Sequence, residues 1–311
     1  MRATERQRGS GQQLRRQYVA WPGNAMSARI GSVTLANPVM TASGTAGYGT
    51  ELAASFELSE LGAVVVKSLA AFEWPGNPAP RLRPTPAGML NSVGLQGPGV
   101  PYWLEHVLPG LLRTGATVVA SVWGRSVQEY RAAAELLSAA PEGVVAVEIN
   151  LSCPNLHDSE MFAHHPQLSA DVVAAVSGAA GRPVWAKLSP NTDRVVAVAT
   201  AVRDAGAEAV TCVNTLLGLA YDPATERPAL GGGGGGLSGP AIHPVAVRVV
   251  HDVAAAMPGF PVIGVGGIAT PWDATEFLLG GAVAVQVGTA TFADPRAPLR
   301  ILRGLGSAAS G

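Results

Sequence analysis

The stretch that could do chemistry most directly is Asn150-Leu151-Ser152-Cys153-Pro154-Asn155. It places one thiol, Cys153, between the carboxamides of Asn150 and Asn155, directly after an apolar run that is typical of a buried strand. Carboxamides can both donate to and accept from a planar polar ligand. We interpret Cys153 as a general base, because a thiolate at a strand end can take a proton. The alternative is an inert buried cysteine, which suits Cys212 better because Cys212 lies inside an expected strand.

Two lysines and two glycine turns also lie at the ends of expected strands. The lysines are Lys67 and Lys187, and the turns are Gly264-Val265-Gly266-Gly267-Ile268 and Gly288-Thr289-Ala290. Backbone N–H groups at such turns, next to a helix start, can hold a phosphate, and a cation beside a bound flavin can stabilise negative charge on its ring. The alternatives are turns that need glycine for backbone reasons alone and lysines that lie along the surface.

Other catalytic arrangements are not evident. His164-His165 lies in a polar stretch, and none of the six histidines has metal-binding spacing with acids or cysteines, so we expect no metal site. There is no Gly-x-Ser-x-Gly elbow. The two cysteines are too few for an iron–sulfur cluster, which needs about four thiolates. We interpret the carboxylates as ordinary solvated charges.

Apolar, β-branched runs alternate with helical segments along most of the chain. The expected strands are 39–43, 63–68, 117–122, 144–150, 184–189, 209–214, 261–266 and 282–288. The expected helices include 126–140, 167–180, 192–206, 242–257 and 271–279, with Thr192 as a cap and Gly206 as a stop for the third of them. Continuous apolar runs are typical of parallel strands buried on both faces. The pattern predicts an α/β fold, a single-domain (β/α)8 TIM barrel with long active-site loops, with an open doubly wound sheet as the alternative.

Three segments depart from the repeat. Residues 69–99 form a long stretch rich in Pro and Gly, which we expect to cover a site, and 156–166 could form a flap. Residues 220–237 include six consecutive glycines at 231–236, which we interpret as a flexible linker. Residues 1–25 are polar and Arg-rich and are expected to be a disordered extension of a catalytic barrel at 26–311; a membrane-surface segment is the alternative.

Composition narrows the classes of function. The chain has 311 residues and 48% of them are hydrophobic, which is enough for a large core. The net charge of −1 and the few aromatic residues argue against nucleic-acid binding. No apolar run is long enough to span a membrane. With two cysteines only, we expect a reducing, cytoplasmic location.

The chain resembles the class 1 dihydroorotate dehydrogenases, and most of all the NAD-linked class 1B catalytic subunit. The resemblance covers nearly all of the chain from about Arg29 onward. Its motifs are Ala42-Ser43-Gly44, Val66-Lys67-Ser68, Gly76-Asn77-Pro78-Ala79-Pro80-Arg81, Asn91-Ser92-Val93-Gly94-Leu95-Gln96, Glu148-Ile149-Asn150 with the cysteine motif above, Lys187-Leu188-Ser189-Pro190-Asn191, Val213-Asn214-Thr215, Gly236-Leu237-Ser238-Gly239-Pro240-Ala241-Ile242 and Gly264-Val265-Gly266-Gly267. One departure is Ser121, where the family usually has Asn, followed by the bulky Trp123.

The resemblance implies FMN-dependent oxidation of (S)-dihydroorotate to orotate in pyrimidine biosynthesis, with Cys153 taking the C5 proton as a hydride leaves C6 for the flavin. The residues that it implies for the cofactor are Ser43, Lys67, Ser68, Ser121, Asn150, Lys187, Val213, Gly239, Gly266, Gly267, Gly288 and Thr289. Those that it implies for the substrate are Lys67, Asn91, Gly94, Leu95, Asn150, Asn155, Asn214 and Thr215. It also implies a homodimer or heterotetramer and an electron-transfer subunit with FAD and an iron–sulfur cluster. Two alternatives remain, a dihydropyrimidine dehydrogenase-like flavoenzyme acting on a neutral pyrimidine and a non-catalytic flavin- or phosphate-binding barrel.

Overall fold

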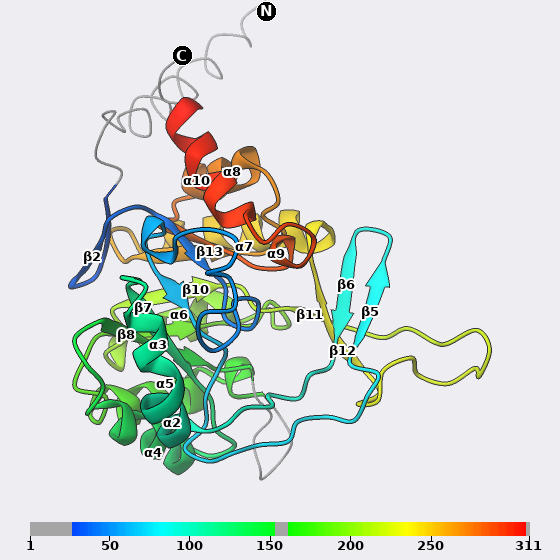
Figure 1. The fold of residues 1–311 in the computed structure, drawn as a ribbon, viewed down its shortest axis with the longest axis horizontal. Helices are drawn as coiled ribbons and strands as arrows, with labels where there is room; N and C mark the ends of the chain where they lie inside the picture. Colours follow the sequence, from blue (N-terminus) through cyan, green and yellow to red (C-terminus); the bar gives the residue numbers. More distant parts are fainter. Residues whose placement is uncertain (1–26, 153–160, 309–311) are drawn as a thin grey trace, which may run out of the picture.

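A closed ring of parallel strands stands at the centre of the computed structural model, which describes residues 27–152 and 161–308 (Figure 1). Around the ring the order is β3 (Val39–Thr41), β14 (Ala284–Val287), β13 (Val262–Val265), β10 (Ala209–Cys212), β9 (Val184–Lys187), β8 (Val144–Asn150), β7 (Val118–Val122) and β4 (Val64–Val65). A parallel bridge between Met40 and Ala63 joins the first strand of this order to the last. The predicted barrel and its eight strands are confirmed.

The strands are mostly apolar because both of their faces are buried. A short hairpin, β1 (Ala28–Ile30) and β2 (Val33–Leu35), packs its buried side chains against interior residues near the beginnings of the strands, such as Met40 and Trp185. The hairpin therefore closes the amino-terminal end of the barrel, and the carboxyl ends of the strands are left for a site.

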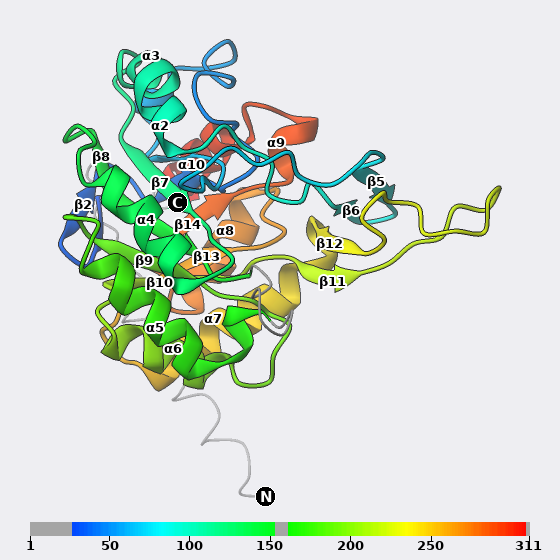
Figure 2. The same ribbon diagram turned by 90° about the horizontal axis from the view of Figure 1, so that it is seen from below.

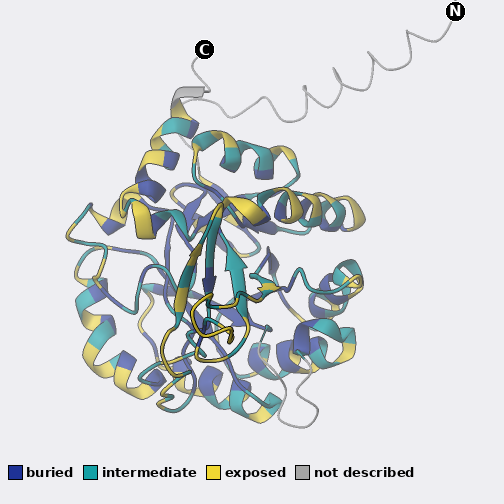
Figure 3. Ribbon diagram, turned by 90° about the vertical axis from the view of Figure 1, so that its right-hand side faces the viewer, coloured by how far each residue is buried: buried dark blue, intermediate teal, exposed yellow. Residues whose placement is uncertain are grey.

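Helices surround the ring, with their inner faces buried and their outer faces exposed (Figure 3). The longer ones are α4 (Val127–Leu137), α5 (Pro166–Ser177), α6 (Val195–Asp204), α7 (His243–Ala256), α8 (Pro271–Leu279) and α10 (Ala297–Ala308). The shorter ones are η1 (Leu58–Glu60), α2 (Val100–Tyr102), the π-helical η2 (Trp103–Val107), α3 (Leu108–Leu112), η3 (Phe162–His164), η4 (Pro240–Ile242) and α9 (Ala290–Ala293). Among the described helices, none is both long enough and apolar enough to cross a membrane.

The starts of α4 and α8 follow local capping chemistry. Ser126 accepts a hydrogen bond from the backbone N–H of Glu129 and caps α4, and Thr270 forms a capping box at the start of α8. The predicted cap at Thr192 is wrong. The N-cap of α6 is Arg194, and the Thr192 hydroxyl instead accepts from the Arg194 backbone N–H at 3.1 Å, because a short turn precedes the helix.

The long segments after β4 and β10 meet in a second, antiparallel sheet that projects beside the barrel (Figures 1 and 2). Its order is β11 (Leu216–Gly218), β12 (Gly235–Ser238), β6 (Gly88–Asn91) and β5 (Leu82–Thr85). The segment 69–99, expected to cover a site, thus contributes a hairpin to this sheet.

The interpretation of 231–236 as a flexible linker is wrong, because its last two glycines belong to β12. Gly236 pairs with Asn91 of β6 and with Leu217 of β11. A Cβ on Gly235 would lie 2.5 Å from the Asn91 carbonyl oxygen, and one on Gly236 would overlap the Thr215 hydroxyl. The missing side chains are therefore a packing requirement between neighbouring strands.

We expect Gly236→Ala to lower the free energy of unfolding by about 1–3 kcal/mol, because the added methyl group overpacks the contact with Thr215. The matched control is Gly234→Ala in the same run, where the new Cβ would lie 3.4 Å from the Gly218 carbonyl oxygen. Urea unfolding of both variants measures the difference. Equal effects of the two changes would show that Gly236 is not held by packing.

Candidate active site

A cavity of about 300 Å³ opens at the carboxyl ends of the barrel strands, between them and the small sheet. The described residues that line it include two lysines, Lys67 and Lys187, and no Asp or Glu. Asparagines, hydroxyl groups and glycine backbones supply most of its other polar surface. This donor set, with two lysines and no acidic side chain among the described lining residues, suits a ligand that carries a phosphate or a carboxylate.

Most residues named from the sequence line this cavity. From the cofactor set these are Ser43, Lys67, Ser68, Asn150, Lys187, Val213, Gly239, Gly266, Gly267, Gly288 and Thr289; from the substrate set they are Lys67, Asn91, Gly94, Leu95, Asn150, Asn214 and Thr215. Cys153 and Asn155 lie outside the described residues. Ser152, which precedes Cys153, lines the cavity. The structure therefore brings most of the described candidates to the wall of one cavity.

Ser121 does not line the cavity. It is fully buried in β7, and its hydroxyl oxygen lies 2.9 Å from that of Ser68, which does line it. Ser121 therefore contacts the cavity lining through Ser68.

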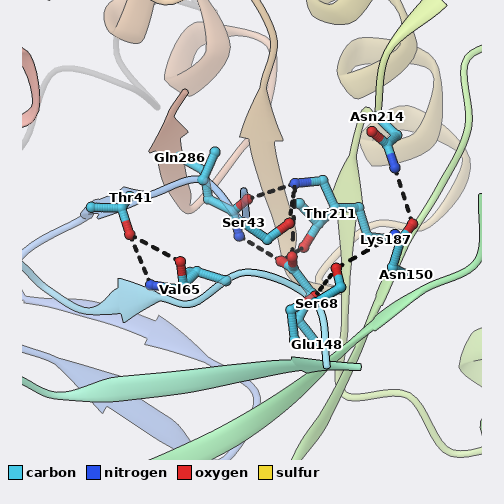
Figure 4. A network of polar contacts seen from close by, with 12 residues as sticks. Thr41, Ser43, Val65, Ser68, Glu148, Asn150, Lys187, Thr211, Asn214 and Gln286 are labelled. Carbon is cyan, nitrogen blue, oxygen red and sulfur yellow. Dashed lines mark hydrogen bonds and ion pairs between the residues drawn. The ribbon is translucent and has the colours of Figure 1, made fainter. Parts of the chain in front are cut away.

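Asn150 is held rigidly at the end of β8 (Figure 4). Its Oδ1 accepts hydrogen bonds from Asn214 Nδ2 at 3.0 Å and from the Ser152 backbone N–H at 3.2 Å. The Tyr130 hydroxyl donates to its backbone carbonyl at 2.6 Å. The direction of the Asn150 amide is thereby fixed before a ligand arrives, which lowers the cost of ordering it on binding.

The glycine turn after β13 is required by backbone geometry. Gly266 and Gly267 have φ of +141° and +70°, and a Cβ on Gly267 would lie 2.7 Å from the His243 Cβ. Both residues also line the cavity, together with Gly288 and Thr289, whose hydroxyl donates to Ser238. The backbone reason and a phosphate-binding role are thus compatible at the same position.

Behind this turn the structure assembles a group that sequence spacing did not indicate. The side-chain nitrogen of His243 and carboxylate oxygens of Asp273 and Glu276, atoms of the kind that can bind a metal ion, lie within 4.8 Å of one another. His243 Nδ1 is 3.1 Å from the Gly266 carbonyl oxygen and its Nε2 is 3.1 Å from Glu276. Asp273 accepts from the backbone N–H groups at the start of α8. His243 therefore supports the turn through Gly266, and Glu276 holds the His243 ring in place.

The interpretation of all carboxylates as solvated charges is wrong for Glu148, which is fully buried inside the barrel. Its Oε1 lies 3.7 Å from Lys187 Nζ. Its Oε2 accepts hydrogen bonds from Thr211 at 3.0 Å and from Gln286 at 2.5 Å. Lys187 Nζ donates in turn to Gln286 Oε1 at 3.1 Å and to Ser43 at 3.5 Å (Figure 4). A cation at the cavity floor is therefore joined to a buried polar network.

The second thiol lies inside a strand, as expected. Cys212 is fully buried in β10, and burial raises its pKa to about 12. Because the thiolate is the reactive form, Cys212 stays unreactive at neutral pH.

Trp123, the bulky residue after Ser121, packs edge-on against Phe72 and Trp74. The Arg125 guanidinium lies over both of the other rings and pairs with Glu129. Trp74 Nε1 donates to the Gly94 carbonyl at 3.0 Å. The aromatic cluster therefore supports the loop that brings Gly94 to the cavity.

A family model described as dihydroorotate dehydrogenase matches residues 25–308 of the chain. The chain is 46% identical over 281 residues to the catalytic subunit of dihydroorotate dehydrogenase B (NAD(+)) from Geotalea uraniireducens, which covers 90% of this chain and 92% of that protein. The subunit of the same name from Geobacter metallireducens is 47% identical over 277 residues, 89% of this chain and 90% of that one. The one from Anoxybacillus flavithermus is 44% identical over 273 residues, 88% and 87% of the two chains.

Proposed function

The chain belongs to the dihydroorotate dehydrogenase family, and from this membership we propose that it oxidises (S)-dihydroorotate to orotate in pyrimidine biosynthesis. The observation that carries the proposal is the cavity itself. It combines two lysines, a rigid pair of asparagines and no described acidic residue at the point where the chain enters the Cys153 motif. Such a site suits an anionic substrate with amide edges.

The family is flavin-dependent, and we propose FMN as the cofactor of this chain. FMN supplies the hydride acceptor when it is bound. The glycine turns at Gly266-Gly267 and Gly288-Thr289 would hold its phosphate through backbone N–H groups, because a cavity-facing turn beside a helix start favours an anion. Lys187 would place a positive charge at the floor, where negative charge on a reduced ring is stabilised.

For the substrate, we propose that Lys67 faces the carboxylate, since a buried anion needs a cationic partner. Asn91, Asn150 and Asn214 would form hydrogen bonds with the amide groups of the dihydroorotate ring, because each carboxamide offers a donor and an acceptor. Asn155 would add a further carboxamide. Cys153 would act as the general base that takes the C5 proton.

The relatives named above are catalytic subunits of NAD(+)-linked enzymes. We propose that this chain likewise works with a partner subunit that carries FAD and an iron–sulfur cluster, within a heterotetramer or on a homodimer. The chain's two cysteines are fewer than the roughly four thiolates that a cluster needs, so the cluster must belong to the partner. A cytoplasmic location stays a prediction from cysteine content.

The test is anaerobic mixing of the FMN-loaded chain with dihydroorotate, dihydrouracil or dihydrothymine while the flavin absorbance is followed. Bleaching by dihydroorotate alone is expected, because only this compound carries the carboxylate that Lys67 would bind. Bleaching by the neutral compounds alone would favour a dihydropyrimidine dehydrogenase, and bleaching by none would leave a passive flavin carrier. Addition of NAD(+), fumarate or a quinone afterwards identifies the electron acceptor.

We expect a chain that lacks residues 1–25 to fold and to reduce its flavin at the rate of the full chain. The family match begins at residue 25, and the described barrel begins at Ser27 with β1 directly after it. Thermal unfolding and the half-reaction with dihydroorotate measure both properties. A lower melting temperature or a slower half-reaction would show that the Arg-rich extension contributes to the catalytic unit.

A further inference from the structure

The side chains that fill the barrel interior change from apolar to polar just below the cavity. At the strand beginnings it is filled by apolar side chains such as Met40, Val65 and Trp185. The layer between them and the cavity contains Glu148, Thr211 and Gln286, all fully buried. Barrel interiors are normally filled by branched apolar residues. A buried carboxylate in this layer costs stability unless it is paired, so its presence needs a physical reason.

The donors and acceptors of this layer match an ionised Glu148. Its Oε2 accepts from the Thr211 hydroxyl and from the Gln286 amide nitrogen. Its Oε1 accepts no hydrogen bond from any residue that the structure describes, and it lies 3.7 Å from Lys187 Nζ. The ammonium of Lys187 is therefore what balances the charge on that oxygen.

The same contacts fix the direction of the cation. Because the Gln286 nitrogen is committed to Glu148, its oxygen faces Lys187 Nζ at 3.1 Å. Ser43, on the cavity wall, completes the shell at 3.5 Å. The ammonium is thus held between the buried carboxylate and Ser43 of the cavity wall, and Figure 4 shows its contacts with Glu148, Gln286 and Ser43.

We propose that Glu148 is the positioning residue for Lys187, supplying the counter-charge that keeps a cation at the cavity floor and, through Gln286, fixing where that cation points. Without the carboxylate, a buried lysine loses its charge in preference to remaining an unpaired cation. With it, the cation is in place before any ligand arrives, and no reorganisation is needed when negative charge develops above it. The stabilisation of negative charge on a reduced flavin rests on the proposed function, but the ion pair between Glu148 and Lys187 does not.

The first experiment uses the flavin-free chain, so it does not depend on the proposed function. Urea unfolding is compared for wild type, Glu148→Gln, Lys187→Met and the double variant. The cycle should show a coupling of at least tenfold in the unfolding equilibrium constant, about 1.4 kcal/mol. Additive effects of the two changes would mean that no functional pair exists and would overturn the inference, even if the flavin chemistry is as proposed.

The second experiment uses the FMN-loaded chain and sulfite, whose binding to a flavin reports positive charge near the ring, with no substrate present. We expect Glu148→Gln and Lys187→Met each to weaken sulfite binding at least tenfold. When Lys187→Met is already present, adding Glu148→Gln should change sulfite binding less than twofold. Thr211→Val removes a hydrogen-bond donor to Glu148 Oε2 but no charge, and it should change sulfite binding less than threefold. Tighter sulfite binding in Glu148→Gln would show that Lys187 keeps its charge unaided, and the inference would fail. A chain that binds no FMN would instead refute the proposed function and leave the unfolding result standing.

Discussion

Flavin reduction by dihydroorotate slows by about 10²- to 10⁴-fold in Cys153→Ala, the loss typical of removing a general base, while FMN remains bound. Cys153 lies outside the described residues, so the expectation rests on its neighbours along the chain. Asn150 is locked by its hydrogen bonds, and Ser152 lines the cavity. The described chain therefore lines the cavity up to Ser152, the residue before Cys153.

Anaerobic stopped-flow absorbance measures the half-reaction, and Cys212→Ala is the matched control. That change also removes a thiol, but one that is fully buried in β10. We expect the control to retain the wild-type rate to within a few-fold. A Cys153→Ala variant that reduces its flavin normally would exclude the thiol as the base.

The dependence of the rate on pH gives an independent check. A cysteine base works as its thiolate, so the rate should rise with pH through the pKa of Cys153, which is about 8.5 for an unperturbed thiol. Burial raises the pKa of Cys212 to about 12, so that thiol does not titrate in this range. A rise that persists in Cys153→Ala would assign the titration to another group.

The barrel was predictable because its signal is local and repeated. Each strand is a continuous apolar run, and parallel strands in a closed ring must bring their carboxyl ends to one rim. Lys67, Lys187 and Asn150 each follow or end such a run, and all three line the cavity. Chain position alone was enough to bring these residues together.

Glu148 escaped prediction although the sequence carries a signal for it. It interrupts the apolar run Val144-Val145-Ala146-Val147-Glu148-Ile149, and Gln286 and Thr211 each interrupt another strand in the same way. A charged residue inside a buried strand must find a partner. Which strands supply that partner depends on register around the ring, and only the structure gives that register.

The interpretation of the glycine run 231–236 as a linker was wrong for a different reason. Glycine weakens a strand by its own preference, so 231–236 suggested a linker. The structure shows two of these glycines in β12, where Thr215 and Asn91 lie too close for any side chain. Asn91 and the glycine run are more than 100 residues apart in the sequence. A local sequence pattern therefore cannot indicate that they lie close together.

The largest effect on stability is expected from Lys187→Met, which we predict lowers the free energy of unfolding of the flavin-free chain by about 3–5 kcal/mol. Methionine keeps most of the side-chain volume, so the loss comes from leaving the fully buried Glu148 without its counter-charge. Urea unfolding followed by circular dichroism measures it. The added change Glu148→Gln should recover much of the loss, because an amide needs no counter-ion. A Lys187→Met variant as stable as wild type would mean that the carboxylate is not charged in the folded chain, since an unpaired charge at that depth cannot be free of cost.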